Sequence, residues 1–277
     1  MYEVRLNILK DKVDKFIVTE STYSHSGKKK KLNFDINNYP KFKDKIIHVV
    51  IDREPDGIVP ENNDPSLQRS NSLKRIALSY DESLKVLKDF SDEDLIMLSD
   101  NDEIPNLDSK DFKKNKKDIV LFKQLFFYFK FNLLYDKMYW FGTKGCKKKK
   151  LKSLSWLKNI KLKKYPFWRI DTLFSETKQI NLQIIQEGGW HFTNLKTPED
   201  MYEKFVNFGH HNEFKLSGLT VEKIREKIKN KEMFYDHFVD QSSTNKWKSD
   251  YKLKNYSSSL LPKYLSDNQN KYKEWFD

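Results

Sequence analysis

Residues 95–105 read Leu95-Ile96-Met97-Leu98-Ser99-Asp100-Asn101-Asp102-Glu103-Ile104-Pro105, and the rest of the chain is organised around them. Four consecutive apolar residues, 95 to 98, indicate a buried strand, and a proline ends the run. Three carboxylates, Asp100, Asp102 and Glu103, follow the strand directly. Because alternate residues of an extended chain face the same side, Asp100 and Asp102 are predicted to point together from the end of the strand.

Two carboxylates at this spacing suit a divalent cation. Hard oxygen ligands favour Mg²⁺ or Mn²⁺, and such an ion also holds a diphosphate. Ligands of open α/β sheets bind beyond the carboxyl ends of the strands, where these acids lie. An acidic turn between a strand and a loop explains the same residues, because a D-x-D pair often arises by chance. Taken alone, the stretch favours the acidic turn.

The elements that precede this stretch predict an α/β fold. Apolar spacing indicates a helix over residues 2–12 and another over 66–88, while residues 16–18 and 46–51 have the composition of strands. Residues 55–65 form a long, turn-rich connection. The order strand, long loop, strand, helix, strand is typical of parallel strands, which need crossover connections. We therefore expect a mostly parallel central sheet flanked by helices.

The later half of the chain is less regular. Residues 119–134 are almost wholly apolar and aromatic, and either a buried helix or a pair of strands fits them. Thr197-Pro198-Glu199-Asp200 is a strong helix start, with an N-cap, a proline and acids in the first turn. The remaining expectations are a strand and turn at 139–142, a surface loop or irregular helix at 144–164, a strand at 180–185, and helices to about 208 and over 221–228.

Composition describes a folded protein of a reducing compartment. Of 277 residues, 38% are hydrophobic and 33% charged, which excludes a disordered chain. The single cysteine, Cys146, excludes an internal disulfide framework. No apolar run is long enough to cross a membrane. We expect a cytoplasmic protein, with peripheral membrane attachment as the alternative.

The net charge of +12 comes mainly from short lysine runs at 28–31, 113–117 and 147–150. Such runs can attract nucleic acid or anionic lipid. No arginine-rich helix or known nucleic-acid module accompanies them, so we interpret them as solvated loops and expect no nucleic-acid partner. A phosphate-bearing partner, either a nucleotide-sugar or an anionic membrane, is consistent with the charge.

Four separated stretches resemble one known family. They are ESTYSHSG at 20–27, QRSN at 68–71, SDNDEIP at 99–105 and GGWHF at 188–192. In this order they are similar to glycosyltransferase family 17, the family of the enzyme that adds the bisecting N-acetylglucosamine to N-glycans. The similarity covers most of residues 3–240. A lone D-x-D is weak, whereas S-D-x-D-E-I-P with a downstream G-G-W-H-F is specific.

The resemblance implies a GT-A-like nucleotide-diphospho-sugar transferase fold that needs Mn²⁺ or Mg²⁺. It implies one domain over 1–240, with a donor-binding part at about 1–110 and an acceptor side at about 111–240, followed by a polar extension at 241–277. The implied reaction moves N-acetylglucosamine from UDP-GlcNAc to a sugar hydroxyl of a glycan acceptor, in a β-1,4 linkage and with inversion. Two departures are a missing first strand before Glu3–Leu9 and a missing membrane anchor, which argues against a Golgi role.

Roles for single residues follow from these interpretations. Asp100 and Asp102 are expected to hold the cation and the diphosphate, with Glu103 as a further ligand, an orienting group or a cap. Glu187 is the expected catalytic base because a strand ends there in a Gly-Gly turn. The other candidates are His191 as a catalytic-site residue that holds a sugar together with Trp190, His210 as a third metal ligand, and Glu20, Ser21, His25, Arg69 and Asn71 in the donor pocket.

Purely structural roles are alternatives for several of these residues. A histidine beside aromatic residues is often a packed one, His210 can terminate a helix, and a helical arginine usually forms a surface salt bridge. A transferase that uses another UDP-sugar, or a non-catalytic member of the family, fits the motifs too. The rival from another class is a basic protein that binds nucleic acid or a membrane surface. Salt-sensitive nucleic-acid binding that Asp102→Ala leaves unchanged would support that rival.

Overall fold

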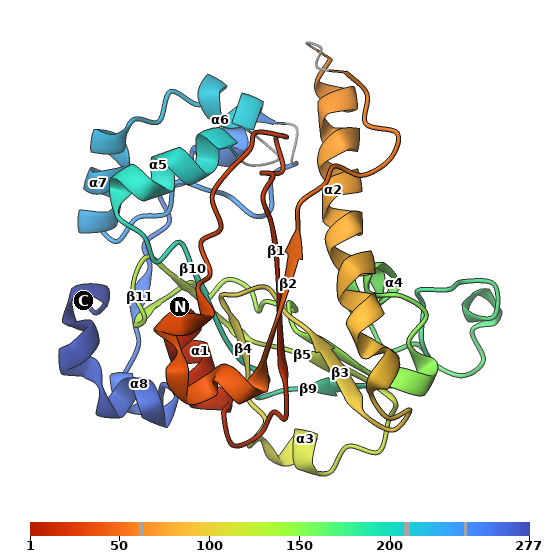
Figure 1. The fold of residues 1–277 in the computed structure, drawn as a ribbon. Helices are drawn as coiled ribbons and strands as arrows, with labels where there is room; N and C mark the ends of the chain where they lie inside the picture. Colours follow the sequence, from red (N-terminus) through yellow and green to blue (C-terminus); the bar gives the residue numbers. More distant parts are fainter. Residues whose placement is uncertain (61–63, 208–210, 241–242) are drawn as a thin grey trace.

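The fold is α/β, as the sequence predicts. A computed structural model describes residues 1–60, 64–207, 211–240 and 243–277 (Figure 1). Its strands are β1 (Phe16–Ser21), β2 (Ile46–Ile51), β3 (Leu95–Leu98), β4 (Glu103–Pro105), β5 (Ile119–Phe122), β6 (Leu125–Tyr128), β7 (Leu133–Leu134), β8 (Lys144–Lys147), β9 (Leu182–Ile185), β10 (Gly189–Thr193) and β11 (Lys254–Asn255). Its α-helices are α1 (Tyr2–Leu9), α2 (Pro65–Val86), α3 (Lys110–Lys113), α4 (Leu154–Asn159), α5 (Pro198–Asn207), α6 (His211–Leu216), α7 (Val221–Lys229) and α8 (Lys263–Asp267).

The first elements of the chain match their predictions closely. Strands β1 and β2 pair in parallel over their full length, from Phe16 opposite Ile46 to Ser21 opposite Ile51. Helix α2 stands beside both strands (Figure 1). Its start is fixed by Asp64, whose side chain accepts a hydrogen bond from the amide of Ser66 at 2.8 Å. The apolar segment 119–134 forms strands rather than a helix.

The prediction of a mostly parallel central sheet is wrong. Over the described residues the strands form three sheets, ordered β1-β2, β11-β7-β6-β10-β4 and β3-β8-β5-β9. In the third sheet β8 pairs antiparallel with both β3 and β5, and only β5 and β9 are parallel. In the second, β10 pairs parallel with β6 but antiparallel with β4. In the third sheet both antiparallel pairs involve β8, which lies in the stretch predicted to be a surface loop or irregular helix.

Strand β8 escaped prediction because its first residue is a buried lysine. Lys144 is 5% exposed and Cys146 is fully buried. The Nζ atom of Lys144 donates to the carbonyl oxygens of Lys158 and Ile160, the second at 2.8 Å. These bonds satisfy an ammonium group that an apolar core would otherwise exclude. Burial, helped by the charge of Lys158, lowers the pKa of Lys144 from 10.5 to about 8.

This pKa predicts a rise in stability with pH. Between about pH 8 and the ordinary value of 10.5 the unfolded chain binds a proton at Lys144 that the folded chain lacks. The free energy of unfolding should therefore rise with pH across this window, in total by about 3 kcal/mol. Urea denaturation from about pH 8 to about pH 10 measures the rise. Lys144→Met should lack it, and an equal rise in that variant would contradict the assignment.

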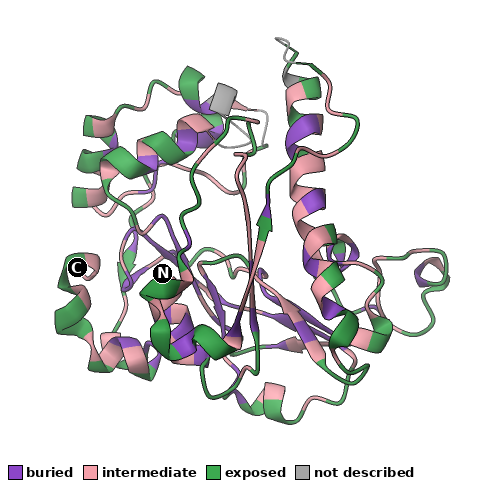
Figure 2. Ribbon diagram, in the orientation of Figure 1, coloured by how far each residue is buried: buried purple, intermediate pink, exposed green. Residues whose placement is uncertain are grey.

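The expected polar extension, residues 241–277, contributes to the core. Strand β11 pairs with β7, and Leu261 and Leu265 are buried in the same apolar cluster as α1 (Figure 2). Trp247 and Leu253 are buried in a second cluster with α5 and α7. No described helix has both the length and the apolar character that a membrane span requires.

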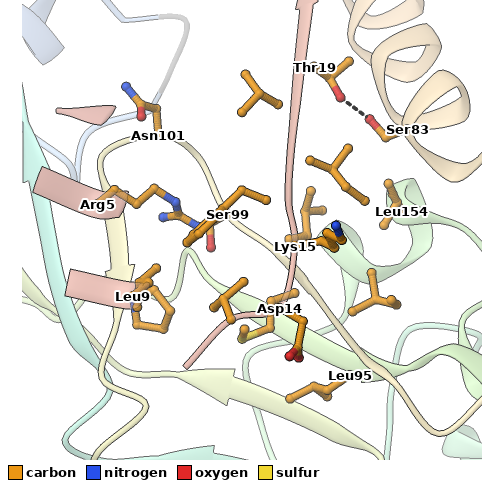
Figure 3. Close-up of a pocket in the computed structure, with 18 of the residues that line it drawn as sticks. Arg5, Leu9, Asp14, Lys15, Thr19, Ser83, Leu95, Ser99, Asn101 and Leu154 are labelled. Atoms are coloured by element: carbon orange, nitrogen blue, oxygen red, sulfur yellow. Dashed lines mark hydrogen bonds between the residues drawn. The ribbon is translucent and has the colours of Figure 1, made fainter. Parts of the chain in front are cut away.

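A cavity of about 670 Å³ lies between β1 and β3. Residues 16–19 of β1 and 95–98 of β3 line it along its length, and among the described residues no strand pairing joins the two (Figure 3). Arg5 and Leu9 of α1 form part of its wall. Of the acidic residues that follow β3, Asp100 lines this cavity.

Candidate functional site

The acidic residues form a turn rather than the end of a strand. Strand β3 ends at Leu98, and the amide of Glu103 donates to the carbonyl of Asp100 at 3.1 Å, after which β4 begins. The two aspartates consequently face different neighbours. Asp100 Oδ2 accepts from Lys158 Nζ at 3.0 Å, while Asp102 Oδ2 lies 3.4 Å from His191 Nε2. The prediction that both point together, which assumed an extended chain, is therefore wrong.

Glu103 holds this turn from the inside. It is fully buried, and its Oε2 accepts from the amide of Asp100 at 2.8 Å while its Oε1 accepts from Trp140 Nε1 at 2.8 Å. Arg5 donates to its carbonyl oxygen. Burial, together with the negative charge of Asp100, raises the pKa of Glu103. Of the three roles considered for Glu103, this geometry favours the orienting group.

Glycine at position 142 makes room for that carboxyl group. A Cβ atom built on Gly142 would lie 1.9 Å from Glu103 Oε1 and 2.5 Å from Trp140 Nε1. Gly142 and Trp140 belong to a sequence stretch read only as a strand and turn. In the structure both support the acidic turn, because Trp140 donates a hydrogen bond to Glu103 and Gly142 leaves space for the Glu103 carboxyl group.

His191 packs against two aromatic rings, which also contact each other. Its imidazole stacks on Trp140 at 4.6 Å between ring centroids and on Phe126 at 4.7 Å, with interplanar angles of 26° and 16°. It is only 5% exposed, and its Nδ1 is buried with no hydrogen-bond partner in the described part of the chain. The rings fix the imidazole plane, so Nε2 is held toward Asp102. His191 is placed to position that carboxylate.

Asp102 remains ionised at neutral pH. Burial favours its neutral form, but the hydrogen bond and charge of His191, with the charge of Lys204, outweigh this effect and lower the pKa of Asp102. Its side chain is 26% exposed. A partly exposed anion held by a packed histidine is a suitable ligand for a cation.

Asp100 is the more accessible of the two aspartates, with a side chain 57% exposed. Lys158, one residue before the end of α4, occupies one of its oxygens. Although burial opposes it, the negative charges of Asp100 and Glu103 raise the pKa of Lys158, so the lysine is cationic. Sequence reasoning missed Lys158 because it lies in a lysine-rich segment with no distinguishing pattern.

The first family motif folds into a loop that Glu20 organises. Its carboxylate accepts from the amides of Asn33 and Phe34 at 2.8 and 2.9 Å and from Lys30 Nζ at 2.6 Å. Ser21 Oγ accepts from the amide two residues further on at 3.0 Å. These contacts shape the loop that follows β1, so the structure gives Glu20 and Ser21 a loop-shaping role in the expected donor pocket.

Helix α2, which carries the second motif, is bonded to the same loop through Arg75, whereas Asn71 of the motif binds the connection that precedes the helix. Asn71 is buried and exchanges hydrogen bonds with the amide and carbonyl of Val59, at 3.0 and 2.8 Å. Arg75 donates to the carbonyl of His25 at 3.0 Å. The side chains of His25 and Arg69 are exposed. The structure thus brings the ESTYSHSG and QRSN motifs together beyond the carboxyl ends of β1 and β2.

Glu187 and Trp190 lie elsewhere. The carbonyl of Gly188 accepts a hydrogen bond from the amide of Asn106. Asn106 lies four residues beyond Asp102, which is about 13 Å along an extended chain. Glu187 is exposed at that far end of β10. Trp190 packs into the apolar cluster on the face of β10 opposite His191. The expected Trp190–His191 sugar clamp is therefore not assembled, and His210 lies outside the described residues.

The acidic turn fits a cation bound partly by substrate. Among the described residues no three His, Cys, Asp or Glu side chains converge on one point. Mg²⁺ and Mn²⁺ sites that serve phosphate transfer commonly take one or two protein carboxylates and complete their shell with phosphate oxygens and water. Asp100 and Asp102 are the carboxylates of the turn that would hold such an ion, and Asp100 would exchange its contact with Lys158 for it.

Comparison with known proteins identifies the family. No curated protein and no solved structure matches the chain significantly. The model of glycosyltransferase family 17 matches residues 1–276, which is nearly the whole chain and includes every motif described above. The acidic turn, His191 and the loop at 20–27 all lie within the matched region. The chain therefore belongs to glycosyltransferase family 17 and is a glycosyltransferase.

Proposed function

We propose that the protein transfers N-acetylglucosamine from UDP-GlcNAc to a glycan hydroxyl, with inversion and in a β-1,4 linkage, and that a divalent cation at the acidic turn is required. The observation that carries the proposal is the acidic turn, in which Glu103 accepts from the amide of Asp100 and His191 contacts the carboxylate of Asp102. The donor sugar and the linkage are supported by the similarity of the four motifs to the family. A GT-A-like donor half is supported by the parallel pair β1–β2 and by α2 beside it.

The proposed donor position lies across the carboxyl ends of β1 and β3, between the acidic turn and the loop at 20–27. Ligands of α/β sheets bind at this edge. The end of the cavity beside the turn is lined by Arg5, Tyr80, Ser99 and Asn101, which offer polar groups to a nucleotide. Arg75, which forms a bidentate pair with Glu54 at 2.8 and 2.9 Å, keeps α2 in register with the loop.

The residues of the acidic turn act on the donor side of an in-line displacement at the anomeric carbon, where the bond to the diphosphate breaks. When bound, the cation supplies positive charge to the leaving diphosphate. Asp100 and Asp102 hold it, His191 positions Asp102, and Glu103 fixes the backbone of the turn. Lys158 can turn from Asp100 toward a phosphate and add a second positive charge. The hydrogen bonds of Glu103 and the contact of His191 with Asp102 keep the turn in place while Lys158 changes partner.

Glu187→Gln is expected to retain turnover within about threefold of the unmodified protein. The reason is placement: Glu187 is exposed at the far end of β10, away from Asp102. Steady-state kinetics with donor and acceptor measure the effect. A loss of transfer with unchanged donor binding would instead restore Glu187 as the base, as the sequence alone led us to expect.

Release of UDP from a panel of UDP-sugars tests the proposed function. We expect the fastest release with UDP-GlcNAc in Mn²⁺ or Mg²⁺, and none in EDTA. Faster release with UDP-glucose or UDP-galactose would overturn the donor assignment. If EDTA left the release of UDP unchanged, the proposed requirement for a divalent cation would be wrong. Lys158 would then be the group that neutralises the charge of the diphosphate.

A further inference from the structure

The segment between α4 and β9, residues 161–179, carries a cluster of exposed apolar side chains. We call it the 161–179 loop; it projects from the body beside α4 (Figure 1). Its exposed apolar residues, with exposed fractions, are Leu162 (48%), Phe167 (80%), Trp168 (68%), Ile170 (70%), Leu173 (78%) and Phe174 (86%). Single exposed apolar residues are ordinary, but a group of this size within one loop marks an interaction surface.

The loop has a defined shape that presents these side chains outward. A short 3₁₀ helix, Ile170–Thr172, forms its tip, and the hydroxyl of Thr172 donates to the carbonyl of Arg169 at 2.6 Å. At its base Trp156 Nε1 donates to the carbonyl of Glu176 at 2.7 Å, and the amide of Lys161 donates to the carbonyl of Thr177 at 3.0 Å. Internal hydrogen bonds therefore hold the backbone while the apolar side chains stay in solvent.

The charges of the loop are strongly asymmetric. It contains five basic and two acidic residues. Both acids are neutralised locally, Asp171 by Arg169 and Lys178 at 2.6 Å each and Glu176 by Lys152 at 3.1 Å. Three further lysines, Lys161, Lys163 and Lys164, are exposed and form no salt bridge within the described residues. The loop thus combines an apolar tip with a cluster of uncompensated positive charge.

We propose that the 161–179 loop docks the protein onto an anionic lipid bilayer. Aromatic and aliphatic side chains at the tip enter the region between headgroups and acyl chains, where tryptophan and phenylalanine are favoured. Lys161, Lys163 and Lys164 contact the acidic headgroups. Apolar side chains next to uncompensated lysines complement a surface that is negative outside and apolar just beneath, which an ordinary protein partner does not offer.

The loop is connected to the candidate active site through α4. Lys158, three residues before the loop, forms the ion pair with Asp100. Docking would consequently hold the acidic turn near the membrane surface. The inference itself rests on exposure and charge in the loop, and it stands whether or not the proposed donor and cation are correct.

Co-sedimentation with lipid vesicles tests the apolar part of the proposal. The unmodified protein is expected to bind vesicles of phosphatidylcholine with about 30% phosphatidylserine, and to bind pure phosphatidylcholine at least about tenfold more weakly. The double variant Phe167→Ser, Phe174→Ser should lower the partition coefficient by about tenfold to a hundredfold. The control Phe238→Ser removes a ring that is 67% exposed but lies outside the loop, and it should change the coefficient by less than about twofold.

A second variant tests the charged part. Replacing Lys161, Lys163 and Lys164 with glutamine should weaken binding to the anionic vesicles by about tenfold or more, with little effect on pure phosphatidylcholine. Near-ultraviolet circular dichroism and UDP release, both expected to be unchanged, show that the loop variants remain folded. Failure of the unmodified protein to bind vesicles, or equal binding by the loop variants, overturns the proposal. The proposal would also be overturned if the unmodified protein formed a concentration-dependent dimer that the phenylalanine variant alone failed to form. The apolar tip of the loop would then be a contact with a second copy of the chain.

Discussion

Asp102→Asn is expected to lower kcat/KM by about a thousandfold while the protein remains folded. Asparagine has nearly the same shape as aspartate, so its side chain can still contact His191 and occupy the same space. What it lacks is the negative charge, which in the unmodified protein His191 and Lys204 preserve by lowering the pKa of Asp102. A neutral amide is a poor ligand for Mg²⁺ or Mn²⁺. The loss should therefore be one of catalysis and not of structure.

Steady-state UDP release with saturating metal measures this loss, and the urea midpoint reports folding. Asp108→Asn is the matched control, because Asp108 is an exposed carboxylate paired with Lys12 and Lys113 away from the acidic turn. The control should keep its activity within about twofold. If Asp102→Asn retained more than about a tenth of the activity, its charge would not be essential to the reaction.

Gly189→Ala is expected to cause the largest loss of stability, on the order of 3–5 kcal/mol. Gly189 has φ = +116°, which side chains rarely allow, and an added Cβ atom would lie 2.2 Å from the carbonyl oxygen of Ile104. That oxygen belongs to β4, the strand with which β10 pairs, so it cannot move without breaking the ladder. The first glycines of GGWHF are thus explained by close approach of two backbones.

Gly218→Ala separates the two causes of this loss. Gly218 also has positive φ, +69°, but an added Cβ atom would meet nothing within 4 Å. It should cost about 1 kcal/mol, because only the backbone conformation is penalised. Urea denaturation of both variants gives the comparison. Equal losses would show that steric contact with Ile104 does not determine the need for glycine in β10.

Apolar spacing and capping residues correctly predicted the helices and strands whose formation depends on neighbouring residues in the sequence. Strands β2 and β3, helix α2 and the start of α5 follow from apolar spacing and capping residues, and Thr197 Oγ1 does accept from the amide of Asp200 at 3.2 Å. Strand orientation was not predictable in this way. It depends on β8, whose buried Lys144 is compensated by carbonyl groups distant in sequence. A charged residue satisfied by tertiary contacts cannot be recognised from composition.

The candidate site shows the same division. The motifs singled out the acidic residues and His191 separately, and the pairing of β10 with β4 places His191 opposite Glu103. Which way each side chain points was not encoded in the spacing, because the chain turns at 100–103 instead of remaining extended. Arg5, Trp140 and Lys158 carry no motif and meet the turn only through the fold.

Binding of UDP measured by isothermal titration, with and without Mn²⁺, tests the central claim most directly. The claim is that the acidic turn holds a divalent cation together with the diphosphate of the donor. The unmodified protein should bind UDP at least about a hundredfold more tightly with Mn²⁺, and Asp100→Ala and Asp102→Asn should each remove most of this enhancement. UDP affinity that is independent of Mn²⁺, or an enhancement that both variants retain, would contradict the claim.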